Sequence, residues 1–191
     1  MRIIPLVCLT LLLAACGSKP QLPEPVGLAY LSQKPIRLKV ARVEVIKQYQ
    51  SSSTPPHVEN DFPVPPVAMI QQWVQDRLLP TGKTGYAVVT IEDASVVEAS
   101  LKGTPGVKGM VTVDQSEQYN AKIAIKIEVF DDAGTLKGFA NARATGSRSV
   151  GENLTLGQRR KVWIVMMEKM MNNLDEEVDR NIKNHLSQFI S

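Results

Sequence analysis

Residues 122–144 read KIAIKIEVFDDAGTLKGFANARA and contain the clearest strand pattern of the chain. Apolar residues occupy every second position from Ile123 to Val129, with mostly charged residues between them. Such alternation predicts a β-strand with one buried face. The sequence Asp-Asp-Ala-Gly at residues 131–134 predicts a hairpin turn, because its glycine suits the left-handed backbone conformation. The chain should therefore return antiparallel to the first strand.

The returning strand, from Leu136 to Thr145, carries small side chains on one face. Ala140, Ala142 and Ala144 share this face and alternate with larger or polar residues. A face of small side chains allows a helix to approach the sheet closely.

The helix that follows is predicted to begin near Thr155 and to continue almost to Ser191. Thr155 and Gln158 have the spacing of a capping box, which marks a helix start. Apolar residues then recur every three or four positions, as expected for one buried stripe. They are Trp163, Met167, Met170, Leu174, Val178, Ile182, Leu186 and Phe189.

Four methionines lie close together on this helix. Met167 and Met170 belong to the stripe and are expected in the core, because methionine fills irregular gaps between packed elements. Met166 and Met171 lie beside the stripe, and one of them is a candidate for contact with a partner.

Several further elements precede residues 122–144. Alternation from Ile36 to Val45 predicts a strand with a bulge near Ala41 and Arg42. Residues 50–66 are rich in proline and serine and have no periodicity, which indicates a long loop.

A helix is predicted from Pro66 to about Leu79, because apolar residues, Trp73 among them, recur there at helical spacing. Residues 86–101 form either one long strand or two strands joined by a bulge, and residues 111–113 are expected to continue the sheet briefly. Trp73 and its counterpart Trp163 are expected to anchor their helices on the sheet.

This order of elements predicts a single α+β domain. We expect an antiparallel β-sheet of four to five strands with two helices packed on one face, the C-terminal helix being long. The composition fits this class, because 191 residues with 43% hydrophobic and 21% charged residues are not typical of a disordered chain.

Residues 1–15 have the features of a cleaved secretory signal. Arg2 precedes an apolar run, residues 3–13, that is shorter than the roughly 20 residues needed to cross a bilayer. Leu13-Ala14-Ala15-Cys16 resembles the lipobox of bacterial lipoproteins. The resemblance implies cleavage before Cys16 and lipid attachment to its sulfur. The alternative is an ordinary signal beside a chance cysteine.

The lipobox also implies a location. Gly17 and Ser18 follow the cysteine, in place of the aspartate that the family uses for inner-membrane retention, which implies the periplasmic face of the outer membrane. Residues 16–35 hold four prolines and are expected to form an extended tether, so that residues 36–191 make up the periplasmic domain. Cleavage would leave 191 − 15 = 176 residues with a net charge of 21 − 19 = +2, because Arg2 is lost. Nucleic acid is therefore not an expected partner.

The body contains no motif for nucleotide or metal binding. Thr81-Gly-Lys-Thr84 matches the end of a phosphate-binding loop, but Arg77 stands where that loop needs a glycine. His57 and His185 have no acidic residue at a zinc-like spacing. Gly146-Ser-Arg-Ser149 also lacks the glycine spacing of a nucleophile elbow. We therefore expect no enzymatic activity, no metal and no cofactor apart from the covalent lipid on Cys16.

Five basic residues form the candidate surface for a partner or an anion: Arg143, Arg148, Arg159, Arg160 and Lys161. The last three occupy the first turns of the long helix, where the helix dipole disfavours cations. This placement indicates a patch for an acidic protein surface or for phosphate-bearing lipid headgroups. The alternative is a solvated face whose charge is offset by Asp175, Glu176, Glu177 or carboxylates of the sheet.

Residues 119–186 resemble the carboxyl half of small envelope lipoproteins that accompany transport machines. The resemblance rests on the aliphatic strand ending at residues 131–134, the small-residue strand ending at residues 143–149, and the long helix. The topology is similar to that of auxiliary lipoproteins of ABC-type lipid transporters and of the lipoprotein that assists lipopolysaccharide assembly. It implies an accessory role in envelope transport or assembly.

The sequence thus supports a leading hypothesis and two alternatives. The leading one is a non-enzymatic lipoprotein, anchored at the outer membrane, that docks on an envelope transport or assembly complex through its sheet edge, long loop and basic patch. The first alternative is a carrier that binds a lipid or another apolar ligand between the helices and the sheet. A periplasmic hydrolase is the second, and it would need serine, histidine and carboxylate side chains to converge in space.

Overall fold

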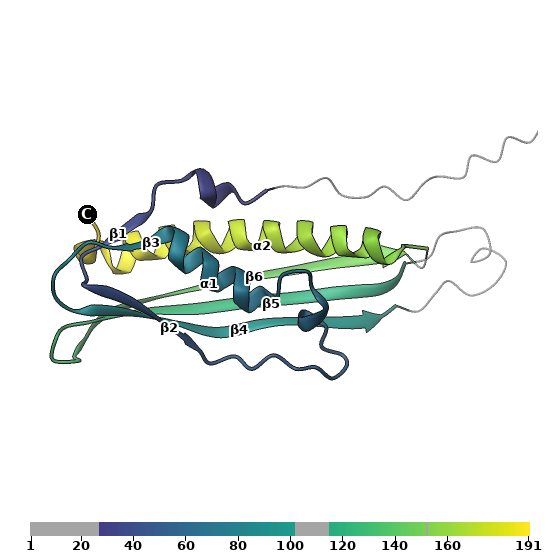
Figure 1. The fold of residues 1–191 in the computed structure, drawn as a ribbon, viewed down its shortest axis with the longest axis horizontal. Helices are drawn as coiled ribbons and strands as arrows, with labels where there is room; N and C mark the ends of the chain where they lie inside the picture. The colour runs from purple at the N-terminus through teal and green to yellow at the C-terminus, as the bar shows by residue number, and fades with distance from the viewer. Residues whose placement is uncertain (1–26, 102–114, 152) are drawn as a thin grey trace, which may run out of the picture.

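The fold is a long sheet with two helices on one face (Figure 1). The computed structural model describes residues 27–101, 115–151 and 153–191. The elements of the main sheet and the helices are β2 (Arg42–Lys47), β4 (Tyr86–Ser100), β5 (Gln115–Phe130), β6 (Leu136–Gly151), α1 (Pro66–Arg77) and α2 (Leu156–His185). The expected α+β class and long C-terminal helix are confirmed. The predicted signal peptide, Cys16 and the strand predicted at residues 111–113 lie outside the described residues.

Shorter elements complete the fold. β1 (Ile36–Leu38) and β3 (Leu78–Pro80) form a separate two-stranded sheet, and the 3-10 helices are η1 (Ala29–Ser32), η2 (Glu59–Asp61) and η3 (Ser187–Phe189).

Strands β4, β5 and β6 form an antiparallel meander at the centre of the core. On the face below the helices, each isoleucine of β5 lies opposite an alanine of β6, and all of them are buried: Ile123 and Ala144, Ile125 and Ala142, Ile127 and Ala140. α2 packs directly on this small-residue face, as the sequence predicts. The expected hairpin turn is present, with Gly134 at φ +77°. β4 is one strand with an irregularity between Ile91 and Asp93.

The first strand of the main sheet differs from the expected antiparallel arrangement. β2 runs parallel to β4, with Arg42 opposite Tyr86 and Lys47 opposite Ile91. Between these two strands the chain passes through the proline-rich loop and α1. A helical crossover of this kind returns the chain parallel to the strand it left, so the sheet is mixed.

The single strand expected over residues 36–45 is divided between the two sheets. β1 pairs with β3, whereas β2 joins β4. At the break, Lys39 N–H donates to the carbonyl of Phe189 at 2.7 Å, and Ala41 N–H donates to the carbonyl of Gly85 at 3.0 Å. These two bonds satisfy backbone groups that belong to neither ladder.

The start of α2 matches the sequence prediction closely. The Thr155 hydroxyl accepts from Gln158 N–H, and the Gln158 side chain accepts from Thr155 N–H, so the capping box is complete. Met167 and Met170 are in the core as expected, and so are Met166 and Met171. Trp73 and Trp163 are also buried. Burying each methionine side chain stabilises the fold by about 1.5–3 kcal/mol.

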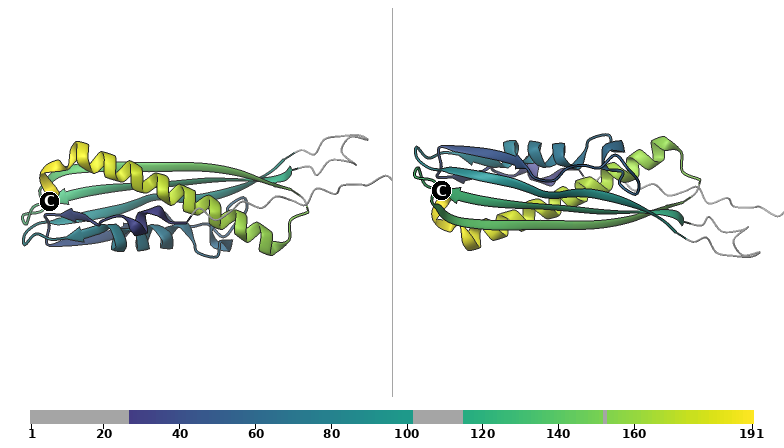
Figure 2. Two further views of the ribbon diagram at one scale, coloured as in Figure 1. Left: turned by 90° about the horizontal axis from the view of Figure 1, so that it is seen from above. Right: turned by 90° about the horizontal axis from the view of Figure 1, so that it is seen from below.

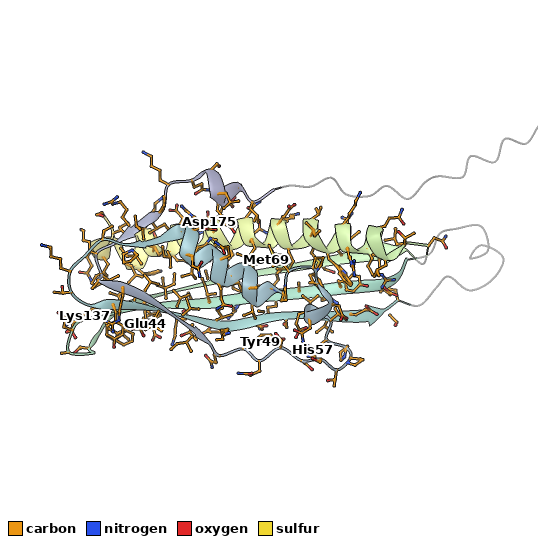
Figure 3. All side chains as sticks on the ribbon, in the orientation of Figure 1. Glu44, Tyr49, His57, Met69, Lys137 and Asp175 are labelled. Carbon is orange, nitrogen blue, oxygen red and sulfur yellow. The ribbon has the colours of Figure 1, made fainter. Side chains whose placement is uncertain are left out.

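A buried ion pair joins α1 to α2 (Asp175 is labelled in Figure 3). Arg77 Nε donates to Asp175 Oδ1 at 2.6 Å, and Trp73 Nε1 donates to the same oxygen at 2.9 Å. The Arg77 guanidinium also donates to the carbonyl of Lys34 and to Gln33 Oε1. One side chain therefore connects both helices with the segment that precedes β1.

Residues 27–35, which belong to the segment expected to form the extended tether, pack on the helices. The Asn172 amide of α2 donates to the Gly27 carbonyl at 2.9 Å and accepts from Ala29 N–H at 2.8 Å. Tyr30 is only 2% exposed. The described chain thus lies along α2 from its first residue.

The proline-rich loop covers the outer edge of β4 beyond the end of β2 (Figure 1). Val58 N–H donates to the carbonyl of Val96 at 3.0 Å, and Glu98 N–H donates to the carbonyl of Pro56 at 2.8 Å. The loop therefore pairs with β4 through an antiparallel bridge between His57 and Val97, whereas β2 pairs with β4 in parallel.

Candidate functional site

The helices leave the other face of the main sheet uncovered within the described residues, as the view from below in Figure 2 shows. Its centre is polar and internally paired: Lys122 Nζ lies 2.7 Å from Asp93, and Lys126 Nζ lies 3.1 Å from Glu128. Burial alone would raise the pKa of Asp93, but hydrogen bonds from Lys122 and Ser95 hold it below its ordinary value. These paired charges make the centre of the face a hydrated surface.

The hairpin end of the same face carries aromatic and apolar side chains. Tyr86 stacks on Phe130 with ring centroids 5.1 Å apart, and the Arg42 guanidinium lies 4.4 Å above the Tyr86 ring. Ile46 and Phe139, which the register places on this face, are 50% and 52% exposed. Ile46 lies opposite Thr90 and Phe139 lies opposite Glu128, so exposed apolar and polar side chains are interspersed at this end of the face.

The two predicted basic residues of β6 lie on opposite faces of the sheet. Arg143 is opposite Ala124 and points to the uncovered face. Arg148 is opposite the buried Tyr119 and points to the face below the helices. Successive side chains of a strand alternate, and an odd number of positions separates these two.

The three basic residues at the start of α2 are also divided. Arg159 donates through Nη1 to Glu117 and, at 2.6 Å, to the Tyr119 hydroxyl. Burial would lower the pKa of Arg159, but the hydrogen bond to Glu117 raises it above its ordinary value. Arg160 and Lys161 are exposed and form no ion pair within the described residues. A sheet carboxylate thus offsets one helix charge, and the five predicted residues do not share one surface.

A pocket of about 500 Å³ lies beside the start of α2. Its charged lining comprises Asp61, Glu98, Arg159 and Arg160, and its apolar lining includes Trp163. The buried Nε1 of Trp163 has no hydrogen-bond partner among the described residues. Two acidic and two basic side chains line the pocket, so their charges balance and favour neither an anionic nor a cationic ligand.

A smaller cleft, of about 330 Å³, lies between the end of β6 and α2, and we call it the methionine cleft. Its apolar lining is Val162, Val165, Met166 and Met170, its basic side chains are Arg148 and Lys169, and Thr145, Gly146, Ser147 and Asn173 complete it. At Gly146 a Cβ would lie 3.0 Å from Met170 Sδ, so the glycine allows the close approach of α2. Neither basic side chain forms an ion pair in the part of the chain that the structure describes. The cleft therefore combines an apolar lining with unneutralised positive charge.

β6 forms one edge of the main sheet, and the cleft lies beside this edge. Asn181 Nδ2 donates to the carbonyl of Asn141 at 2.7 Å, which shows that this carbonyl points away from β5. Outward-pointing residues alternate along an antiparallel strand, so Arg143, Thr145 and Ser147 also direct their N–H and C=O groups outward. No described residue pairs with these groups.

A buried carboxylate holds the proline-rich loop on β4 (Tyr49 and His57 are labelled in Figure 3). Glu59 accepts from the Tyr49 hydroxyl at 2.5 Å, from Ser52 N–H at 3.1 Å and from Val96 N–H at 3.2 Å, and His57 Nδ1 lies 3.3 Å away. Burial alone would raise the pKa of Glu59, but these hydrogen bonds, that of Tyr49 first, lower it below its ordinary value. With four partners the carboxylate is satisfied, and its role is to fix the loop.

The sequence predicted only part of the methionine cleft. Arg148 is among the predicted residues, whereas Lys169 and Gly146 are not. The available signal was the small-residue run of β6, which extends to Gly146. Lys169 follows Val165 by four residues at the margin of the apolar stripe, where a lysine is ordinarily solvated.

No three histidine, cysteine or acidic side chains among the described residues are placed to hold a metal ion together. None of the described helices combines the length and the hydrophobicity needed to cross a membrane.

Comparisons with known proteins give only distant likenesses. No protein-family model matches the chain, and no curated protein matches it. Among solved structures, a minor lipoprotein from Acinetobacter baumannii is 10% identical with a TM-score of 0.39, over 77% of this chain and 93% of that chain. The rare lipoprotein B from Shewanella oneidensis is 8% identical with a TM-score of 0.40, over 75% of this chain and 95% of that chain.

A variant of PelC from Paraburkholderia phytofirmans, solved as a dodecamer, is 12% identical with a TM-score of 0.23, over 73% of this chain and 90% of that chain. At these identities and TM-scores, none of the three structures transfers a fold or a function to this chain.

Proposed function

We propose that the chain is a non-enzymatic, lipid-anchored accessory subunit that docks on a transport or assembly complex of the bacterial envelope. The anchor rests on Leu13-Ala14-Ala15-Cys16, and the assignment to the periplasmic face of the outer membrane rests on Gly17 and Ser18. Between Cys16 and Gly27 there are 27 − 16 = 11 residue steps, which span at most about 40 Å when fully extended. The folded body would therefore stay close to the membrane.

The uncovered outer edge of β6 carries the proposal. Soluble proteins usually blunt or cover a long edge strand, because its free N–H and C=O groups pair readily with other chains. From Arg143 to Ser149 no described residue covers the edge of β6. An edge of this length fits a protein that works while attached to a partner.

A second candidate function is a carrier of lipid, and the methionine cleft favours it. An apolar lining with Arg148 and Lys169 suits an acyl chain that ends in an anionic headgroup. The space directly between α2 and the alanine face of β6 is filled by buried side chains. A lipid would therefore lie at the margin of the sheet and not beneath the helices.

Site-specific photocrosslinking in intact cells tests the docking proposal. A benzophenone amino acid is placed at Thr145 on the edge or at Phe139 on the uncovered face, and the products are recovered through a carboxyl-terminal tag. We expect both positions to capture subunits of one envelope complex, and Cys16→Ala to reduce the yield. Matched control positions are Glu176 and Asn184, which are exposed on α2. Equal capture from all four positions, or no protein captured from any of them, would reject docking.

A further inference from the structure

We infer that the outer edge of β6 from Arg143 to Ser149 takes up an extended segment of the partner protein as an additional strand. The inference rests on the proposed function and specifies the chemistry of the docked segment, which carries an apolar and an acidic side chain two positions apart. Recognition of this type combines main-chain hydrogen bonds with pockets for alternate side chains.

The main-chain groups needed for such pairing are already aligned. The outward direction of the Asn141 carbonyl fixes the phase, so the N–H and C=O groups of Arg143, Thr145 and Ser147 face away from β5. The register between β5 and β6 has no shift over this part of the strand, so no bulge turns the edge aside. Thr145 and Ser147 are exposed and small, and their side chains leave the edge accessible.

The hairpin half of the edge is partly engaged by α2, and it borders a separate pocket lined by residues 138–141, Asn181 and His185. Near the hairpin, Asn181 occupies the carbonyl of Asn141, and Leu186 packs so tightly on Gly138 that a Cβ there would lie 2.8 Å from Leu186 Cδ2. The Asn141 carbonyl is therefore already bonded, whereas the outward groups from Arg143 to Ser149, which border the methionine cleft, have no partner among the described residues.

The methionine cleft lies where alternate side chains of the added strand would point. A strand residue opposite Gly146 or Arg148 directs its side chain to the face below the helices, because paired residues share a face. Gly146 has no side chain, so the position opposite it opens onto Met166 and Met170. This position fits an apolar residue.

The position two residues away fits a carboxylate. It lies opposite Arg148, and Lys169 contributes a second positive charge from α2. Neither basic group has an ionic partner among the described residues, so an acidic side chain would supply the missing countercharge. The spacing of the two positions, apolar and acidic, follows from the period of a strand.

A peptide uses both the edge and the cleft, whereas a lipid uses only the cleft. An acyl chain with a phosphate headgroup suits the apolar lining and the basic side chains, but it has no groups to pair with a row of N–H and C=O. An extended polypeptide satisfies that row and fills the cleft with the same segment. We therefore commit to a protein segment as the occupant.

Peptide binding tests the inference. The probes are two fluorescein-labelled peptides, TTTLTETTT and TTTETLTTT, whose two orders of leucine and glutamate cover both strand directions. Fluorescence anisotropy measures their affinity for the full chain carrying Cys16→Ala. We expect one of them to bind at least about tenfold more tightly than the same peptide with serine for leucine and lysine for glutamate, a ratio that anisotropy resolves.

N-methylation of the peptide separates strand pairing from other contacts without changing the protein. In an added strand, alternate amides face β6 and the others face solvent. Methylating the set that faces β6 should abolish binding, and methylating the other set should leave the affinity within about twofold. Equal effects of the two sets would overturn the inference.

Variants of the protein test the two components separately. Ser147→Pro removes one outward N–H without removing a bond to β5, since proline is tolerated on sheet edges, and should lower the affinity at least about tenfold. Ser147→Ala keeps that N–H and should leave the affinity unchanged. Lys169→Glu should shift the preference toward the peptide that carries lysine in place of glutamate. If Lys169→Glu leaves the preference for the glutamate peptide unchanged, the charge of the cleft does not contribute to peptide recognition.

The remaining outcomes also decide between hypotheses. Failure of all peptides, together with binding to phosphatidylglycerol vesicles, would overturn the inference and assign the cleft to lipid. Recovery of the envelope complex from cells that carry Ser147→Pro would support docking and would show that the partner does not dock by adding a strand to β6. If no complex is recovered from any crosslinking position, docking itself fails.

Discussion

The buried pair between Arg77 and Asp175 allows a quantitative test of what holds the two helices together. Both side chains are 2% exposed, and Asp175 Oδ1 accepts from Arg77 and from Trp73. Asp175→Leu would leave the guanidinium with only the neutral acceptors at Lys34 and Gln33, and the indole N–H with none. Breaking a buried pair from one side costs about 3–5 kcal/mol. We expect a loss of about 4 kcal/mol, a large part of the roughly 5–15 kcal/mol that stabilises a domain.

The assay is urea unfolding of the full chain carrying Cys16→Ala, followed by far-ultraviolet circular dichroism. The double variant Arg77→Met with Asp175→Leu should be more stable than the sum of the two single losses predicts, by about 2 kcal/mol or more, because it buries no unpaired charge. The control is Lys183→Met, which breaks the exposed pair with Asp179 and should change stability by less than about 0.5 kcal/mol. A loss below about 1 kcal/mol for Asp175→Leu, or strict additivity in the double variant, would refute this reasoning.

Three further predictions concern the loop, a turn and the start of α2. Because the pKa of Glu59 is lowered in the folded state, its carboxylate stabilises the fold at pH values above its ordinary pKa of 4.5. This contribution is lost as the pH falls through the lower folded-state pKa. Between pH 7 and pH 3, the urea midpoint should therefore fall more steeply for the unaltered chain than for Glu59→Gln. Gly85→Ala should cost about 3 kcal/mol or more, because the new Cβ would lie 2.5 Å from the carbonyl oxygen of Phe130. Gly27 also has a left-handed φ but has open space around it, so Gly27→Ala should cost about 1 kcal/mol. Thermal melts of the two variants test the difference. Thr155→Ala removes the capping box and should cost about 1 kcal/mol in urea unfolding, and Thr155→Ser should restore most of it.

Local patterns were sufficient to predict the centre of the fold. The alternation from Ile123 to Val129, the turn at residues 131–134 and the capping box at Thr155 each depend on neighbours within a few residues, and all three are present. The small-residue face of β6 also predicted that a helix would approach it, because side-chain volume is a property of the sequence itself.

Features that depend on distant partners were not predictable. The direction of β2 is set by the crossover through α1, and a strand has the same alternation in either direction. Asp175 appeared as a solvent carboxylate on the helix surface, yet it pairs with Arg77 across 98 residues of sequence. The candidate site shows the same limit: Arg148 was found by its charge, whereas the free edge of β6 becomes visible only when the strand order is known.

The packing of residues 27–35 along α2 has a mechanical consequence. Tension from a membrane anchor would reach the body first through the hydrogen bond from Gly27 N–H to Glu168 and the two hydrogen bonds of Asn172, and then through the guanidinium of Arg77. This load would act on the segment in shear along the helix, so that several bonds resist it together, instead of peeling β1 from its sheet one bond at a time. Because α2 also packs on β6, the helix would transmit force between the anchor and a partner held at the outer edge of β6.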